Sequence, residues 1–291
     1  NTEELVSDYT FWSTYQLSQA ANKSGYKVML SGMGGDEAFA GYPRYHVLKN
    51  HRFLQLIYPF LKLMLISRIY PRKLDKKFSR LISYIKENKW GVAYSRLLGY
   101  FSREELLSLF GNAESDFYLS YTAKLDRILE NYNGDVNDKV KMGQYLDLYG
   151  FLPHNLMVSD KASMLASIEL RVPLLDESVV ANGIFESSSK LIDFNNTKKP
   201  LKYLLRSLLP KRFVKRPKTG FNPPLDTLIN NIGKERLLFE LGMFRNFISS
   251  DFAIKLINNH FDGIDNNSYK LWQLLYFKCW LDNNSNFDRQ S

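Results

Sequence analysis

Residues 28–45 read VMLSGMGGDEAFAGYPRY, and the rest of the chain is best understood outward from this stretch. Its first three residues continue a short apolar run bounded by Ser31-Gly32, as expected for a buried strand. An amphipathic segment precedes it, Phe11 to Ala21, which predicts a helix. The local order is therefore helix, strand and glycine-rich loop.

The loop combines a nearly bare backbone with two carboxylates. Gly32, Gly34 and Gly35 let the main chain approach an anion closely, and Asp36 and Glu37 stand where the next helix begins. Two interpretations fit this pattern. The loop is either a tight strand-to-helix connection whose acids interact favourably with the helix dipole, or a ligand site at the carboxyl end of a parallel strand.

Composition limits the kinds of partner and the compartment that suit the chain, but it does not identify the function. The net charge of +9 suits acidic substrates such as nucleotides and leaves nucleic acid open. A single cysteine, Cys279, rules out an internal disulfide and fits a reducing, cytoplasmic compartment. The four histidines show no metal-ligand spacing, so no zinc site is expected.

The start of the chain does not resemble a signal peptide. The first residue is Asn1 and its surroundings are polar, so we expect an excised piece of a longer protein. The most apolar window, Phe53 to Ile66, contains Pro59 and Lys62 and is too short to span a bilayer. It predicts a buried helix pair, and no membrane partner is expected.

Helices dominate after Tyr45. Periodicity predicts them over about 46–70, 73–88, 90–100, 102–110, 114–132 and 136–156. Only two later segments could add a strand, Ile168 to Val172 and Lys190 to Phe194. Because a parallel strand needs neighbours, most of the sheet should precede Asn1. Residues 1–45 would then end a parallel-sheet core, and 46–291 would form a mainly helical portion.

Two further stretches carry charged groups of interest. Residues 158–176 read VSDKASMLASIELRVPLLD and place Asp160 near a turn and Glu169 two residues before Arg171, a pairing that is commonly a weak surface contact. Residues 211–221 read KRFVKRPKTGF. That segment is either a solvated basic loop or one that projects Lys218 towards polyphosphate.

Taken together, these stretches resemble the glutamine-hydrolysing asparagine synthetase family. Leu30 to Tyr42 matches that family's LSGxGGDExFxGY signature, residues 160–176 resemble its DKxxM…ExRxPxLD segment, and Arg216, Lys218 and Phe221 fit its basic loop. The resemblance is to the C-terminal synthetase domain. It implies an α/β, predominantly helical fold: part of a parallel sheet of the PP-loop ATPase type, followed by a helical bundle.

The resemblance also implies a chemistry. In that family ATP activates a carboxylate as an adenylate, and ammonia then displaces AMP. It implies that Ser31, Gly32, Gly34 and Gly35 bind the nucleotide and that Asp36 is catalytic and binds Mg²⁺. Lys218 would stabilise charge on the phosphates. ATP and Mg²⁺ are the implied cofactors, and Asp160 and Arg171 are implied only as structural or pocket-lining groups.

Several features limit what the resemblance implies. No Ser-Gly-Gly-x-Asp-Ser pyrophosphate loop and no N-terminal cysteine nucleophile occur in these residues, so this piece alone is expected to be inactive. Met33 stands where the family commonly has an acid. The acceptor, aspartate or another carboxylate, stays open, as does a homodimer. Ammonia would come from an upstream glutaminase domain.

Two alternatives from other classes remain open. The chain could be a degenerate, non-catalytic homologue that acts as a binding or scaffold module, as Met33 suggests. It could also bind nucleic acid through the basic clusters 72–77 and 211–218, although we expect no nucleic-acid partner.

Overall fold

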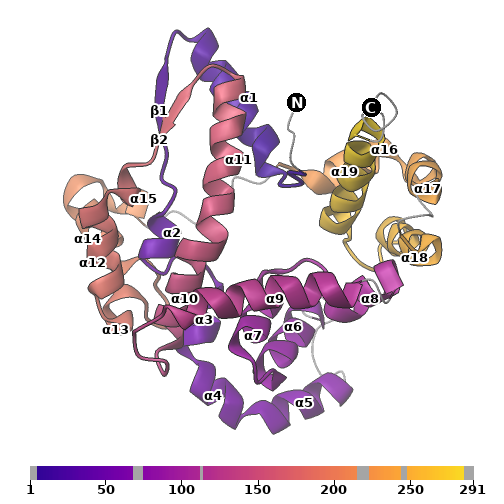
Figure 1. The fold of residues 1–291 in the computed structure, drawn as a ribbon. Coiled ribbons are helices and arrows are strands. Elements are labelled where there is room, and N and C mark those ends of the chain that lie inside the picture. The colour runs from indigo at the N-terminus through magenta and orange to yellow at the C-terminus, as the bar shows by residue number, and fades with distance from the viewer. Residues whose placement is uncertain (1–4, 68–74, 112–113, 215–222, 244–247, 285–291) are drawn as a thin grey trace.

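The computed structural model describes residues 5–67, 75–111, 114–214, 223–243 and 248–284. Within these residues the chain is mostly helical, with two short strands (Figure 1). The elements of the first half are α1 (Thr10–Lys23), β1 (Val28–Leu30), α2 (Gly35–Ala38), α3 (Arg44–Lys49), α4 (His51–Leu56), α5 (Tyr58–Ser67), α6 (Asp75–Lys86), α7 (Trp90–Leu98), α8 (Arg103–Phe110), α9 (Glu114–Glu130) and α10 (Lys139–Leu146). Those of the second half are α11 (Leu152–Leu165), β2 (Glu169–Arg171), α12 (Glu177–Phe185), α13 (Ser188–Leu191), α14 (Lys199–Leu208), α15 (Lys211–Val214), α16 (Leu225–Ile232), α17 (Lys234–Gly242), α18 (Ser250–Phe261) and α19 (Ser268–Asn284).

A small parallel sheet joins two distant parts of the sequence. β1 pairs with β2, with Met29 opposite Leu170, and α1 packs along α11 beside them (Figure 1). The strand predicted around 168–172 is therefore confirmed. The strand predicted at 190–194 is wrong, because α13 carries the chain to Leu191 and Asp193 then accepts hydrogen bonds from the backbone of a polar turn.

The central helices share one hydrophobic core. Its largest fully buried side chains include Tyr45, Tyr84 and Tyr94, contributed by α3, α6 and α7. The helix predicted over 46–70 is broken into pieces, and Pro59 sits in the first turn of α5, where a missing N–H costs nothing. The helix predicted over 102–110 is confirmed as α8, which begins with a capping box formed by Ser102 and Glu105.

The helix predicted over 136–156 contains an irregularity. α10 runs into a π-helical segment, Asp147–Phe151, before α11 continues the path. Such a segment inserts an extra residue into the turn and is frequent at functional sites. Here it places Asp147 in the core with no exposed surface.

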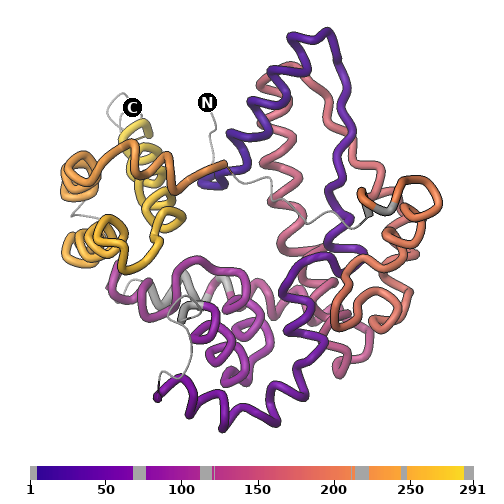
Figure 2. Tube along the Cα trace, turned by 180° about the vertical axis from the view of Figure 1, so that it is seen from behind, coloured from indigo at the N-terminus to yellow at the C-terminus, as the bar shows by residue number. Residues whose placement is uncertain are grey.

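The last four helices form a second hydrophobic core. Leu237, Ile257 and Leu271 are fully buried there, and Leu109 of α8 packs with them. Trp272 of α19 donates its indole N–H to the carbonyl of Ser7 at 3.0 Å. The C-terminal bundle therefore contacts both the central helices and the segment before α1 (Figure 2).

The apolar window from Phe53 to Ile66, which forms most of α4 and α5, is buried on one side only. Leu61 faces the core, but Phe53, Phe60 and Leu63 are about 60% exposed. The prediction of a buried helix pair is thus wrong for the outer face, because the core offers these two short helices only one side. In the part of the chain that the structure describes, no helix is long and apolar enough to cross a bilayer.

Candidate active site

The loop after β1 is held in place by its own backbone. The Ser31 amide continues the sheet by donating to the carbonyl of Arg171 at 2.8 Å. Met33 N–H donates to Ser31 Oγ at 3.3 Å, and Gly35 N–H donates to the carbonyl of Gly32 at 3.4 Å. These three amides already have partners, so an incoming anion would rely on the loop's other groups, among them the Ser31 hydroxyl and the backbone at Gly32.

The three loop glycines serve different purposes. Gly34 has φ +84°, and a Cβ there would overlap the side chain of Leu175. Gly35 would bring a Cβ to 2.8 Å from Leu174, so both positions need glycine for packing against the 3₁₀ turn Pro173–Leu175. Gly32 is exposed and a Cβ there meets nothing within 4 Å. Of the three, only Gly32 has space above it for a ligand.

Asp36 projects from the first turn of α2 and is mostly covered. Its carboxylate is 19% exposed, and Oδ1 lies 3.0 Å from Nζ of Lys198. A Cβ on Gly41 would overlap both partners, so this glycine makes room for the pair. The contact links the strand-loop-helix unit to the start of α14, 162 residues away along the chain.

Lys198 was missed by sequence reasoning. It stands just before α14 with φ +52° and ψ +39°, a left-handed conformation that is uncommon for a residue with a side chain. In the sequence, Lys198-Lys199-Pro200 indicates only a basic helix start. Residues with strained backbone conformations often cluster at functional sites, so the left-handed conformation of Lys198 makes it a candidate site residue.

A cavity of about 560 Å³ opens beside the loop. The lining comes from α1 and the residues before it, β1, the loop, α2 and the residues after it, the π-helical segment, α11 and β2: Asp8, Tyr9, Thr10, Thr14, Leu17, Met29, Leu30, Ser31, Gly32, Met33, Asp36, Glu37, Tyr42, Phe151, Asn155, Ser159 and Leu170. It brings together three of the sequence-predicted residues, Ser31, Gly32 and Asp36. Asn155 and Ser159 of α11 add polar groups that no sequence motif indicated.

Met33 gives this cavity an apolar character next to the loop. It joins Leu17, Met29 and Leu170 on the wall, and the charged residues of the lining are Asp8, Asp36 and Glu37. Cavities of this kind, mostly apolar with a few placed polar groups, are typical of small-molecule sites. The volume is sufficient for a drug-sized or nucleotide-sized ligand.

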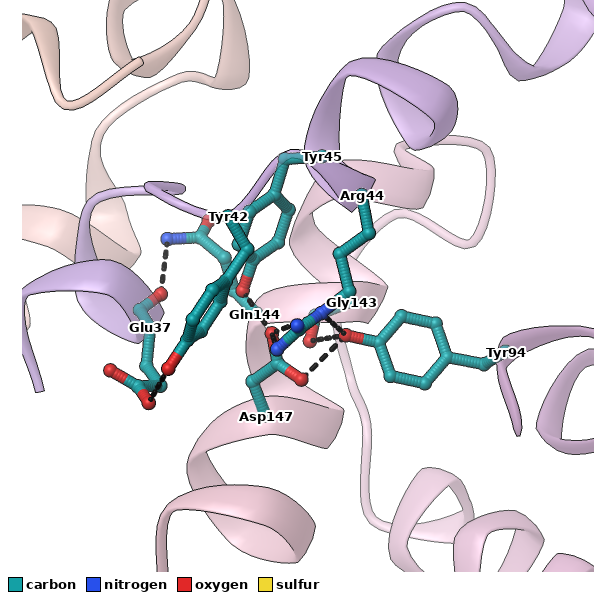
Figure 3. A network of polar contacts seen from close by, with 8 residues as sticks. All are labelled: Glu37, Tyr42, Arg44, Tyr45, Tyr94, Gly143, Gln144 and Asp147. Atoms are coloured by element: carbon teal, nitrogen blue, oxygen red, sulfur yellow. Dashed lines mark hydrogen bonds and ion pairs between the residues drawn. The ribbon is translucent and has the colours of Figure 1, made fainter. Parts of the chain in front are cut away.

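Glu37 is turned inward and belongs to the support of the loop. Its side chain accepts a hydrogen bond from the Tyr42 hydroxyl at 2.7 Å (Figure 3). Burial raises the pKa of the Glu37 carboxyl, and the Tyr42 hydrogen bond opposes that rise. Gln144 of α10 donates to the carbonyls of Glu37 and Ala38 at 3.2 and 2.6 Å. α2 is thereby fixed to the helical body.

A buried charge network continues from this point (Figure 3). Arg44 Nη2 donates to Asp147 Oδ2 at 2.7 Å, and its guanidinium lies 3.8 Å from the centre of the Tyr42 ring. The hydroxyls of Tyr45 and Tyr94 each donate to Asp147 at 2.5 Å. The π-helical segment thus presents Asp147 to donors from α3 and α7.

Burial and neighbouring groups shift the pKa values of both Arg44 and Asp147. Burial opposes the charge of Arg44, but the phenols around it and Asp147 outweigh that effect and raise its pKa. Burial raises the pKa of Asp147, and Arg44 and the two hydroxyl donors limit the rise. Because Arg44 stacks on Tyr42, which holds Glu37, the network positions α2 rather than contacting a ligand.

The remaining predicted residues do not meet at this cavity. Asp160 is exposed within α11 rather than at a turn, because α11 continues to Leu165. Arg171 pairs with Glu169 at 2.9 Å on the surface, and its backbone, not its side chain, contacts the loop. Lys218, with Arg216 and Phe221, lies outside the described residues.

A magnesium site made of protein ligands alone is not present among the residues with described positions, which contain no cluster of three acidic, histidine or cysteine side chains. Asp36 fits a different arrangement. Mg²⁺ commonly takes one or two carboxylates and completes its shell with water and substrate phosphates. Asp36, one of three carboxylates on the lining of a nucleotide-sized cavity, suits that kind of site.

Comparison with known proteins gives a consistent result. The family model described as asparagine synthase matches residues 2–282. Asparagine synthetase (glutamine-hydrolyzing) 1 of Bacillus subtilis is 29% identical over 87% of this chain and 40% of that protein. A putative asparagine synthetase (glutamine-hydrolyzing) of Mycobacterium bovis is 28% identical over 96% of this chain and 42% of its own length. No solved structure matches the chain.

Proposed function

Because the chain belongs to the asparagine synthase family, we propose that it is the synthetase portion of an ATP-dependent ligase that forms an amide. The observation that carries the proposal is the position of Ser31, Gly32 and Asp36 on one cavity at the carboxyl end of β1. Open α/β sheets bind their ligands at that end. The net charge of +9 is in keeping with an anionic substrate.

The proposed reaction has two steps. A carboxylate oxygen of the acceptor attacks the α-phosphorus of ATP, the bond to pyrophosphate breaks, and a mixed anhydride with AMP forms. The nitrogen of ammonia then attacks the acyl carbon, AMP leaves, and the amide remains. Aspartate is the acceptor implied by the relatives' names, and another carboxylate is the alternative raised by Met33.

We assign the following roles. Ser31 and Gly32 contact the nucleotide, while Gly34 and Gly35 allow the loop to approach α2 and the 3₁₀ turn closely enough to form the site. Asp36 holds Mg²⁺, which when bound neutralises phosphate charge. Lys218 stabilises charge on the phosphates, a role in which a positioned cation supplies much of the catalysis.

We add Lys198 to this proposed set as a positioning residue. Its ammonium is 3.0 Å from Asp36 Oδ1 and only 25% exposed. We propose that it fixes the orientation of the Asp36 carboxylate. Partners of this kind behind a metal ligand commonly affect metal affinity or activity.

The chain spans about 40% of the length of the curated relatives it matches. We propose that it works as part of a longer protein, with ammonia delivered by a glutaminase domain, and that it does not complete the reaction alone. In this proposal, residues 1–45 end the PP-loop-type nucleotide core and 46–291 form the mainly helical portion. The same proposal places the protein in the reducing cytoplasm and leaves room for a homodimer.

Met33 supports a second candidate function. A thioether cannot accept a proton or neutralise ammonium, so a chain that lacks the usual acid could have kept the fold and lost the chemistry. The second candidate is therefore a non-catalytic binding module. It predicts a folded protein that binds Mg-ATP weakly or not at all.

One experiment separates the two. The full-length gene product is supplied with Mg-ATP and ammonia, and pyrophosphate release is measured across aspartate and other carboxylates. Release that depends on one carboxylate supports the ligase and names its acceptor. No release with any carboxylate, from a protein shown to be folded, supports the binding module.

A further inference from the structure

The helices α4 and α5 carry a continuous apolar outer face. Five large side chains on them are 59–79% exposed: Phe53, Leu56, Phe60, Leu63 and Ile66. We call these five residues the rim face. The opposite side of the same helices packs on the central core through Leu54, Ile57 and Leu61. The pair is therefore apolar on both sides, and only one side is used by the fold.

The rim face lies at the edge of the molecule. α4 and α5 follow one another along the lower rim, on the far side of the central helices from β1 and β2 (Figures 1 and 2). A ligand at the candidate active site would leave it uncovered. Exposed apolar patches of this kind usually mark a surface that binds something else.

The charged side chains of α4 and α5 are all basic. Residues 38–74 contain no Asp or Glu, although the whole chain has 30. Arg44 in this stretch is buried against Asp147, and Asp135 and Asp138 line the same pocket as Arg52 on one flank. Arg52 and Lys62, on α4 and α5 themselves, are exposed. Burial and then the nearby charges of Lys139 and Arg52 lower the pKa of His51, as expected in a positive local field.

We infer that the rim face docks on the surface of an anionic lipid bilayer. Helices with Phe and Leu on one side and basic residues beside them lie in the plane of a membrane interface, with the apolar side chains among the acyl chains. Each Lys or Arg near an anionic leaflet adds about 1 kcal/mol of attraction. α5 has 10 residues and would lie on the membrane, not span it.

Charge argues against a second copy of this chain as the occupant. Two copies packed through the rim face would bring Arg52 and Lys62 close to their own equivalents. Juxtaposed like charges at an interface are costly. An anionic lipid surface instead complements both features of the face, its apolar side chains and its positive charge.

The sequence had led us to expect no membrane partner. That expectation rested on a window too short to span, with both sides used in the core. Phe53, Phe60 and Ile66 are exposed, so the two helices are not buried on both sides. The window is still too short to span a bilayer, but a peripheral contact does not require a spanning helix.

The test is sedimentation of the full-length protein with vesicles. Vesicles of phosphatidylcholine alone are compared with vesicles containing phosphatidylglycerol. We expect binding to the anionic vesicles that weakens as salt rises, and a loss of tenfold or more in the double variant Phe60→Glu/Leu63→Glu. The control variant is Phe185→Glu/Phe194→Glu, which places the same charges on side chains 87% and 85% exposed in other elements. It should bind like wild type.

Three results would overturn the inference. One is equal binding to neutral and anionic vesicles, or none to either. Another is an equal loss in the rim and control variants while both keep the wild-type melting temperature. The third is a dimer in solution that the rim variant dissociates while vesicle binding is unaffected. None of these outcomes bears on pyrophosphate release, so the ligase proposal is tested separately.

Discussion

Lys198 and Asp36 form an ion pair with Nζ 3.0 Å from Oδ1, although the two residues are separated by 162 positions in the chain. The pair couples the loop after β1 to the start of α14. Lys198 holds a left-handed backbone conformation where it makes this contact. Lys198 thus orients the carboxylate proposed to hold Mg²⁺, although no sequence motif indicates this lysine.

Replacing Lys198 tests this role. Lys198→Met removes the charge that orients Asp36, and we expect the full-length enzyme to lose about 10- to 100-fold in activity or in affinity for Mg²⁺. Lys199→Met is the matched control, because Lys199 pairs with Asp193 instead, at 3.4 Å. Equal kinetics in the two variants would remove Lys198 from the site.

The loop glycines make a second, paired prediction. Gly34→Ala combines a positive φ with an overlap on Leu175 and should lower the free energy of unfolding by about 1–3 kcal/mol. Gly32→Ala meets open space, so its unfolding should change by less than about 0.5 kcal/mol while nucleotide affinity falls. Chemical denaturation and calorimetric titration measure the two quantities. A stable Gly34→Ala variant, or an unchanged affinity in Gly32→Ala, would contradict the assignment.

The buried network predicts a large stability effect away from the ligand. Asp147→Asn leaves the Arg44 guanidinium, 12% exposed, without its compensating charge. Removing one partner of a buried pair costs about 3–5 kcal/mol. The control is Glu169→Gln, which breaks the surface pair with Arg171 and should leave the melting temperature unchanged. Similar melting temperatures for the two variants would mean that the network does not hold α2 in place.

Lys141 predicts a pH dependence. Its ammonium donates to the carbonyls of Gly183 and Ile184 at 3.1 and 2.8 Å, and burial lowers its pKa to about 8. The unfolded chain therefore binds the proton more tightly than the folded one, so this group adds stability as pH rises from 8 towards 10.5. Denaturation at pH 8 and pH 10 should show wild type gaining relative to Lys141→Met. Lys141→Arg, charged throughout, should also lack the gain; a gain in either variant would point to another group.

Local signals in the sequence were sufficient for much of the fold. The helices predicted over 102–110 and 114–132 are set by neighbours a few residues apart, and the structure confirms them as α8 and α9. The order of strand, loop and helix indicated a loop at the carboxyl end of a strand, and the family resemblance implied the roles of Ser31, Gly32 and Asp36. These features depend on short spacings, which a sequence displays directly.

What the sequence did not display depends on distant contacts. The strand expected after Lys190 fails because that segment is held by α13 and a polar turn. The π-helical segment arises where Asp147 meets donors 53 to 103 residues away. Both sides of α4 and α5 carry large apolar residues, so only the packing could show which of them are exposed.

The exchange of label from pyrophosphate into ATP tests the central claim most directly, because it reports reversible formation of the adenylate without requiring ammonia. The full-length protein is incubated with ATP, Mg²⁺, labelled pyrophosphate and a carboxylate. We predict exchange that requires the carboxylate and is abolished in Asp36→Asn, whose melting temperature stays near that of wild type. Exchange that persists in a folded Asp36→Asn protein, or that no carboxylate supports in wild type, would contradict the account.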